Sequence, residues 1–133
     1  MIVVDTNVIA ALYLSSDRAA QAEYALRRDP EWAAPLLWRS ELRSVLTLYL
    51  RKGMLALADA LAIMDEASRL MRDREYEVAS FQVLRLVANS TCSAYDHEFV
   101  ALAQDLGVPL VTTERQVLEQ FPGLAVPLEA FAG

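Results

Sequence analysis

The sequence has little cysteine, histidine or lysine, and each shortage narrows the kinds of protein it can be. Its one cysteine, Cys92, cannot form a disulfide within the chain, and a lone thiol is typical of a reducing compartment. One cysteine and one histidine cannot supply the ligands of a structural zinc ion. No stretch of about 18 apolar residues is present and the first residues carry no basic segment, so we expect no membrane span and no signal peptide. These shortages favour a cytoplasmic protein.

Glycine and proline are also scarce, with 4 and 5 residues among 133, and no Gly/Ser/Pro-rich stretch divides the chain. We therefore predict a single domain over residues 1–133. The apolar content of 55% is enough for one substantial core. A domain of this size buries roughly two thirds of the surface that its unfolded chain exposes.

Basic residues are outnumbered, and the formal net charge is −6. This balance argues against a protein that holds nucleic acid by a broad basic surface. Eleven of the 12 basic residues are arginines, and Lys52 is the single lysine. Guanidinium groups suit local contacts with phosphate. Acids gathered around a metal ion would make the charge negative, although an acidic solubilising surface would do the same.

Short apolar segments alternate with helical patterns along the chain, which predicts an α/β domain with a mostly parallel sheet covered on both faces. Two capping boxes, Ser93–Asp96 and Thr113–Gln116, mark helix starts, Ser80 is a further expected cap, and Gly107 marks a helix end. The expected strands are 2–4, 32–34, 76–79, 108–111 and 124–126. The expected helices are 8–12, 17–28, 36–51, 55–74, 81–89, 94–106 and 113–121.

Polar residues follow two of the expected strands directly. Asp5 comes after the first strand, and Thr112, Thr113 and Glu114 follow the strand that ends near Val111. In parallel sheets, ligands bind beyond the carboxyl ends of the strands. Asp5 and Glu114 are therefore candidate site residues, although Asp5 would also serve as a helix cap and an acid is welcome in any first helical turn.

Two further acids lie on expected helices. Glu41 falls within an apolar stripe with no oppositely charged partner one turn away, and a carboxylate there is costly unless it is paired, protonated or bound to a cation. Alternatively, Glu41 lies at the margin of the stripe and its carboxylate is in water. Asp96 completes the first capping box for local reasons, and its second oxygen would remain free for a metal.

Four ordered blocks of the sequence resemble the PIN-domain family, particularly its VapC-type toxin ribonucleases. They run from Asp5 to Ile9, from Trp38 to Leu42, from Ser93 to Ala103 and from Leu110 to Thr113. The similarity covers nearly the whole chain and includes the segment 81–86. It implies a three-layer α/β/α fold around a central parallel sheet.

The resemblance further implies that Asp5, Glu41 and Asp96 bind Mg²⁺ or Mn²⁺ and support the cleavage of RNA. Glu114 stands where family members commonly have an aspartate, so it is a possible ligand of a second metal. Oxygen donors of this kind favour Mg²⁺ or Mn²⁺, and a cation would relieve the repulsion among the carboxylates. We expect three residues around the acids to orient the carboxylates by hydrogen bonds: Thr6, Asn7 and Thr112.

Other residues near these blocks have weaker predicted roles. Arg39, Arg43 and Arg115 flank the acids and are candidates for contacts with RNA phosphates, although surface solvation would explain them equally. His97 adjoins Asp96, but neighbouring residues on a helix point in different directions, so a packed or solvated histidine is the better interpretation than a general base.

Apolar content between residues 36 and 71 exceeds what the core requires, which predicts a homodimer face or a groove for a partner. The resemblance implies that this partner is a cognate antitoxin, which could place a basic side chain among the acids. These positions would otherwise complete the core.

Two other functions remain open at this point. A phosphoaspartate enzyme or receiver domain also has an acid after its first strand, but it usually needs a late lysine, and Lys52 is in the middle of the chain. A catalytically weak PIN-like interaction module is the second alternative, suggested by Glu114 and the acidic surface.

Overall fold

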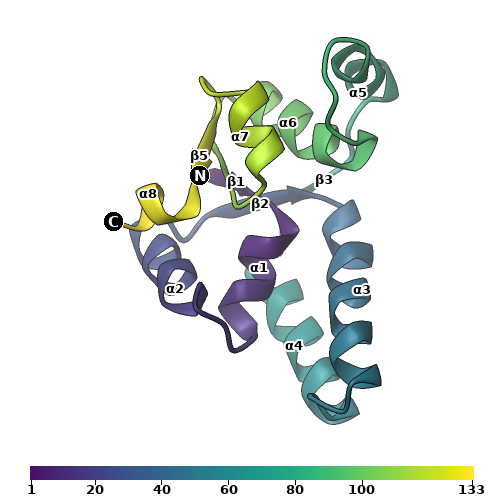
Figure 1. The fold of residues 1–133 in the computed structure, drawn as a ribbon, viewed down its shortest axis with the longest axis vertical. Helices are drawn as coiled ribbons and strands as arrows, with labels where there is room; N and C mark the ends of the chain where they lie inside the picture. The colour runs from purple at the N-terminus through teal and green to yellow at the C-terminus, as the bar shows by residue number, and fades with distance from the viewer.

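Five short strands form one sheet in the computed structural model, which describes residues 1–133 (Figure 1). The strand order is β3-β2-β1-β4-β5, and every neighbouring pair is parallel. The predicted α/β class is confirmed, with a sheet that is wholly parallel. In chain order the strands are β1 (Ile2–Val4), β2 (Trp32–Pro35), β3 (Glu75–Tyr76), β4 (Leu110–Thr112) and β5 (Ala125–Pro127).

Helices connect the strands and cover both faces of the sheet. They are α1 (Thr6–Tyr13), α2 (Ala19–Arg28), α3 (Leu37–Arg51), α4 (Leu57–Leu70), α5 (Ser80–Val87), α6 (Ala94–Leu106), α7 (Arg115–Gln120) and α8 (Leu128–Ala132). None is both long and apolar enough to cross a bilayer. The short helix α8, which packs on α2, was not predicted.

The elements form three layers, with α5, α6 and α7 on one side of the sheet and α1 to α4 on the other (Figure 1). The central strand β1 is fully buried, as is α6 where it packs across β1, β2 and β4. A strand covered on both faces requires apolar side chains in both directions, which explains the unbroken Ile-Val-Val run. The three-layer arrangement expected from the family resemblance is therefore present.

The strand order and the helices that follow the strands create a crevice at the carboxyl ends of two neighbouring strands, β1 and β4. The chain leaves β1 into α1 on one face, whereas it leaves β4 into α7 on the other face (Figure 1). Because β1 and β4 are neighbours, their carboxyl ends open a crevice between the two helix layers. Such a switch in connection direction is where open α/β sheets bind ligands.

Several local expectations were wrong. The helix expected over 55–74 is shorter, and the strand expected over 76–79 is the two-residue β3. Ser80 does not cap α5, because the carbonyl of Ala79 already accepts the first helical bonds and makes Ala79 the N-cap. Thr113 does not cap α7, because Glu114 takes the N-cap position and its amide donates to the Thr112 hydroxyl instead, at 2.9 Å.

Candidate active site

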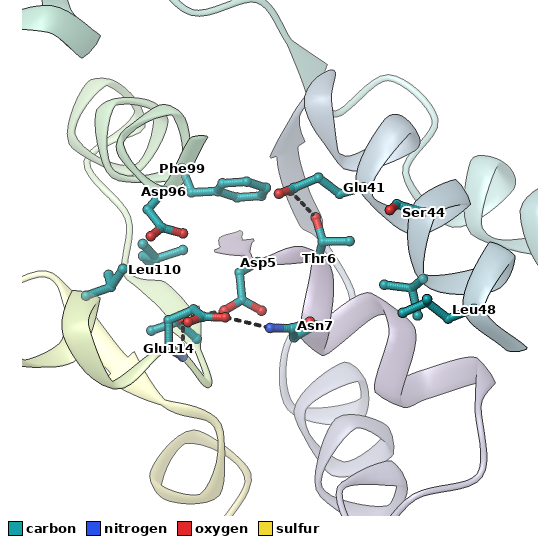
Figure 2. A pocket seen from close by; sticks show the side chains of 13 residues that line it. Asp5, Thr6, Asn7, Glu41, Ser44, Leu48, Asp96, Phe99, Leu110 and Glu114 are labelled. Carbon is teal, nitrogen blue, oxygen red and sulfur yellow. Dashed lines mark hydrogen bonds between the residues drawn. The ribbon is translucent and has the colours of Figure 1, made fainter. Parts of the chain in front are cut away.

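A cavity of about 300 Å³ opens at the carboxyl ends of β1 and β4. Four of its 13 lining residues are acidic and none is basic. Figure 2 shows Asp5 and Glu114 on one side of this space, with Asp96 and Glu41 facing it from α6 and α3. The structure thus brings together all four acids that the sequence marked as candidates.

Asp5 is the most buried of these acids, at 7% exposure, and it lies between β1 and the start of α1. One carboxylate oxygen caps α1 by accepting from the amide of Val8 at 3.0 Å. The other accepts from the Thr112 hydroxyl and from the amide of Thr113 at 3.1 Å. Burial, with a smaller contribution from the charge of Glu114, raises the pKa of Asp5 to about 6 despite these bonds. Asp5 therefore caps α1 and lines the cavity with the same side chain.

Glu41 lies in the second turn of α3 and points across the cavity toward α1. Its carboxylate accepts from the Thr6 hydroxyl at 2.7 Å. Burial raises the pKa of Glu41, the Thr6 bond lowers it, and the charges of Asp96 and Glu114 raise it again. Glu41 is half-buried and has no basic partner, so its charge is left uncompensated within the protein.

Asp96 occupies the first turn of α6, where its amide donates to the Ser93 hydroxyl at 3.1 Å. This bond confirms Ser93 as the cap of α6. The side chain of Asp96 is turned toward the cavity (Figure 2). A negative charge at this position is stabilised by the helix dipole, which helps to explain how an acid is tolerated there beside Glu41.

Glu114 borders the cavity just before α7, and Asn7 donates to its carboxylate at 2.7 Å. The three predicted outer residues each contact a different acid: Thr6 contacts Glu41, Asn7 contacts Glu114, and Thr112 contacts Asp5. Such bonds restrict the rotamers of the acids and fix which oxygen remains free.

The donor set suits a hard divalent cation, since carboxylate oxygens are the ligands that Mg²⁺ and Mn²⁺ prefer. In the structure as it stands, no three Asp, Glu, His or Cys side chains are grouped closely enough to hold one ion. The bonds from Thr6 and Asn7 hold Glu41 and Glu114 toward the start of α1. Repulsion among the carboxylates opposes their closer approach. A cation would give these acids a shared partner that the protein itself does not supply.

Ser44 and Phe99 in the cavity, and Glu98 outside it, were missed from the sequence, although helical spacing could have identified the first two. Ser44 lies three residues after Glu41 and Phe99 three residues after Asp96, so each shares a helix face with an acid. Glu98 lies close to Glu41, whose charge adds to burial in raising the pKa of Glu98. Glu98 carried no signal in the sequence beyond its place two residues after Asp96.

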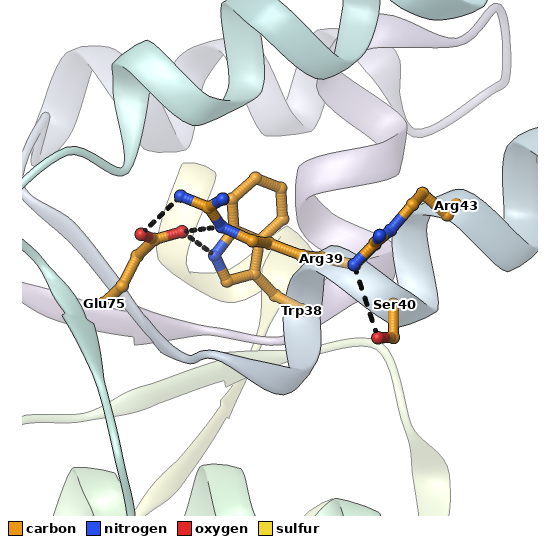
Figure 3. Close-up of polar contacts among 5 residues, drawn as sticks. All are labelled: Trp38, Arg39, Ser40, Arg43 and Glu75. Carbon is orange, nitrogen blue, oxygen red and sulfur yellow. Dashed lines mark hydrogen bonds and ion pairs between the residues drawn. The ribbon is translucent and has the colours of Figure 1, made fainter.

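The three arginines proposed for phosphate contacts do not line the cavity. Arg39 forms a bidentate ion pair with Glu75, at 2.6 and 2.8 Å (Figure 3). Arg43 donates to the carbonyl of Arg39 at 3.1 Å, and the exposed Arg115 lies 3.8 Å from Glu119. Their predicted contacts with RNA stay predictions.

His97 and Lys52 lie outside the acidic cluster. His97 is fully buried, its Nδ1 lies 2.6 Å from the carbonyl of Ser93, and its ring packs edge-on against Phe121. The interpretation of His97 as a packed residue is confirmed. Lys52 caps the far end of α3 and does not line the cavity, so it cannot act there as the lysine of a phosphoaspartate site.

Comparison with known proteins identifies the family of this chain. The model of the PIN domain matches residues 2–123, which include all four acids. The chain belongs to the PIN domain family. This PIN domain is 31% identical over 129 residues to "Ribonuclease VapC3" of Pyrobaculum aerophilum, covering 95% of the chain and 98% of that relative. It is a VapC-type PIN domain.

Two solved structures share the fold of this PIN domain. The crystal structure of PAE2754 from Pyrobaculum aerophilum superposes with a TM-score of 0.78 at 22% identity, covering 98% of this chain and 92% of that one. A toxin-antitoxin complex from Klebsiella pneumoniae superposes with a TM-score of 0.71 at 17% identity, covering 96% and 98%. At these identities the likeness concerns the fold.

Proposed function

We propose that this PIN domain is a Mg²⁺- or Mn²⁺-dependent endoribonuclease and the toxin of a toxin-antitoxin pair. The observation that carries the proposal is the cavity at the β1–β4 switch point, where four carboxylates meet without a basic residue. The 31% identity to a relative named as a ribonuclease supports RNA as the substrate. An acidic cavity accepts a phosphodiester only when cations first neutralise it.

In this proposal Asp5, Glu41 and Asp96 hold the metal directly or through water, with Glu114 a possible ligand at a second position. A bound divalent ion would lower the pKa of a water molecule and stabilise the charge that develops on the scissile phosphate. The chain's own part is to present the oxygens: Asp5 from a position fixed by Thr112 and Thr113, and Glu41 from a helix. Thr6 holds Glu41, and Asn7 holds Glu114, within reach of the cavity.

Purified protein with a labelled single-stranded RNA provides the test of this function. Cleavage should require Mg²⁺ or Mn²⁺, stop with chelator, and be abolished in Asp96→Asn, which preserves size and removes charge. The matched control is Asp65→Asn, an exposed aspartate on α4 outside the cavity, which should cleave normally. Cleavage that persists without metal, or an active Asp96→Asn, would refute the assignment. Mapping RNA 5′ ends after expression in bacteria would then identify the target.

A groove beside the cavity supports the proposed antitoxin partner. It runs between α1 and α3, is lined by Ala10, Ala11, Leu14 and Tyr49, and shares Asn7 and Val45 with the acidic cavity. A bound peptide with apolar residues here could place a basic side chain among the acids. The toxin-antitoxin complex among the structural neighbours is consistent with such a partner.

We also propose a homodimer, because large apolar side chains on the α3–α4 hairpin are exposed. Met54, Leu57 and Leu61 are at least 60% exposed, and a self-association surface would cover them. Size-exclusion chromatography with light scattering tests this point, and a monomer at micromolar concentration would refute it. Cys92 is a free thiol, which fits a reducing cytoplasm as the location.

A further inference from the structure

Glu75, on the edge strand β3, is bonded to two consecutive residues of α3 (Figure 3). One oxygen accepts from the Trp38 indole at 2.7 Å and from Arg39 Nε at 2.6 Å, and the other accepts from a terminal nitrogen of Arg39 at 2.8 Å. The side chain of Glu75 is only 15% exposed. We call the group of Glu75, Trp38 and Arg39 the Glu75 latch.

The start of α3 is held by the packing of the buried Trp38 but has no polar cap. Its N-cap, Leu36, offers no side chain to the free amides of the first turn. The backbone of Leu36 is tied to β3 by the bond from its amide to the carbonyl of Tyr76, at 3.0 Å. β3 runs beside β2 with Glu75 opposite Ala34, so the Glu75 carboxylate lies beside the point where the chain turns into the helix. The latch therefore supplies the side-chain anchor that the N-cap lacks.

Together with the packing of the fully buried Trp38 and Leu42, the latch restricts the rotation of α3 about its axis, because its two contacts lie on adjacent residues that point about 100° apart around a helix. Glu41 follows Trp38 by three residues and so lies near the same side of α3. A helix with its side chains has a radius of about 5–6 Å, so a rotation of about 10° would move the Glu41 carboxylate by about 1 Å. Displacements of about 1 Å in an active site can lower rates by about 100-fold.

We propose that Glu75 is a positioning residue, which holds Glu41 in the acidic cavity by fixing the first turn of α3. In this role the guanidinium of Arg39 is part of the latch and does not contact RNA. The inference rests on the proposed function and adds to it a residue outside the acidic cluster. Nothing in the sequence joined Glu75 to Glu41, because the two lie in different elements and share no motif.

The test compares wild type with Glu75→Gln, Arg39→Gln and the double variant. RNA cleavage at saturating Mg²⁺ should fall about tenfold in kcat in each single variant and no further in the double variant, with KM within about twofold of wild type. Mg²⁺ affinity, measured by calorimetry without RNA, should fall in the same variants. Arg39→Lys, which keeps the charge but loses the bidentate fork, should recover part of both quantities.

A spectroscopic signal separates positioning from simple loss of stability. The chain has two tryptophans, and the Trp38 indole donates to Glu75 whereas Trp32 Nε1 has no partner. The Trp38 indole proton should shift when Mg²⁺ is added to wild type and should not respond in Glu75→Gln. Asp29→Asn is the control, because it removes the 2.9 Å ion pair with the N-terminal amine, which is not part of the α3 anchor. It should lower stability and leave kcat and Mg²⁺ affinity unchanged.

The outcomes distinguish the two proposals. Unchanged kcat and Mg²⁺ affinity in Glu75→Gln and Arg39→Gln would overturn the latch and leave the nuclease standing. A rise in KM at constant kcat, confined to Arg39→Gln, would overturn the latch and place Arg39 on the RNA. A wild type that binds Mg²⁺ with the expected Trp38 shift but cleaves no RNA would overturn the nuclease alone.

Discussion

The buried carboxylate of Asp5 should make the metal-free protein less stable as the pH rises through the weakly acidic range. Burial raises the pKa of Asp5 from 3.8 to about 6, so the folded protein binds a proton more tightly than the unfolded chain. A raised pKa gives stability at low pH that is lost as the pH rises through the folded value. The loss amounts to about 3 kcal/mol once the pH is well above 6.

Asp5→Asn removes this titration while keeping the size of the side chain. An asparagine oxygen in the place of Oδ1 can still accept from Val8, but the side-chain amide nitrogen then takes the place of Oδ2 and faces the amide of Thr113, which donates to Asp5 at 3.1 Å in the wild type. The mismatch should cost about 1 kcal/mol. The net effect at pH 7.5 is therefore a gain of about 2 kcal/mol for the variant without metal, or about 8 °C in melting temperature for a chain of this size.

Urea unfolding of both proteins in chelator, at pH 7.5 and pH 4.5, checks the magnitude. The advantage of the variant should shrink by about 2 kcal/mol at pH 4.5, where the wild-type carboxyl is protonated in the folded state. Saturating Mg²⁺ should reverse the order at pH 7.5, because the cation stabilises only the protein that binds it. A difference between the proteins that is independent of pH would contradict this prediction, because it would show that Asp5 ionises as freely in the folded state as in the unfolded one.

Three further predictions concern Asp96, Glu41 and the end of helix α6. Mg²⁺ at about 100 times its Kd should add about 2.7 kcal/mol to wild-type stability in thermal unfolding and clearly less to Asp96→Asn, and an equal response would remove Asp96 from the site. Thr6→Val deletes the bond that lowers the pKa of Glu41, so the acidic limb of the cleavage pH profile should move to higher pH, and an unmoved profile would separate Glu41 from catalysis. Gly107→Ala should lower the free energy of unfolding in urea by about 1 kcal/mol, because φ at this position is +65°. Cleavage should not change, since an added Cβ would meet nothing within 4 Å. An unchanged free energy of unfolding would contradict the strain assigned to a side chain at this φ.

The helices and strands that carry the site were predictable because the sequence signals that mark their ends are local. The apolar run of β1, the Ser93 cap and the left-handed Gly107 each mark an element boundary within a few residues, and all three are present in the structure. The boundaries that failed lie where a neighbour competes locally, as at Ser80, where the preceding carbonyl starts the helix one residue earlier. Short strands such as β3 leave almost no periodic signal.

The contacts between distant segments were not predictable from spacing. Glu41 could be marked as unusual because a carboxylate on an apolar stripe needs a partner, but the identity of its partner, Thr6, depends on how α3 packs on α1. The same holds for Arg39, whose flanking position suggested RNA, whereas β3 brings Glu75 to it. Sequence reasoning locates charges that need an explanation, and the fold decides which partner each one meets.

The run Asp5-Thr6-Asn7 shows how a short motif organises a site made from distant elements. These three residues begin α1, and successive positions in a first helical turn point in different directions. Asp5 is therefore directed to the end of β4, Thr6 to Glu41 on α3, and Asn7 to Glu114 before α7. Since β1 is the buried centre of the sheet, this turn stands at a fixed point while the other acids are brought to it from both helix layers. A substitution at any of the three should thus disturb one acid and leave the other contacts in place, which separates the contributions of Asp5, Glu41 and Glu114 to metal binding.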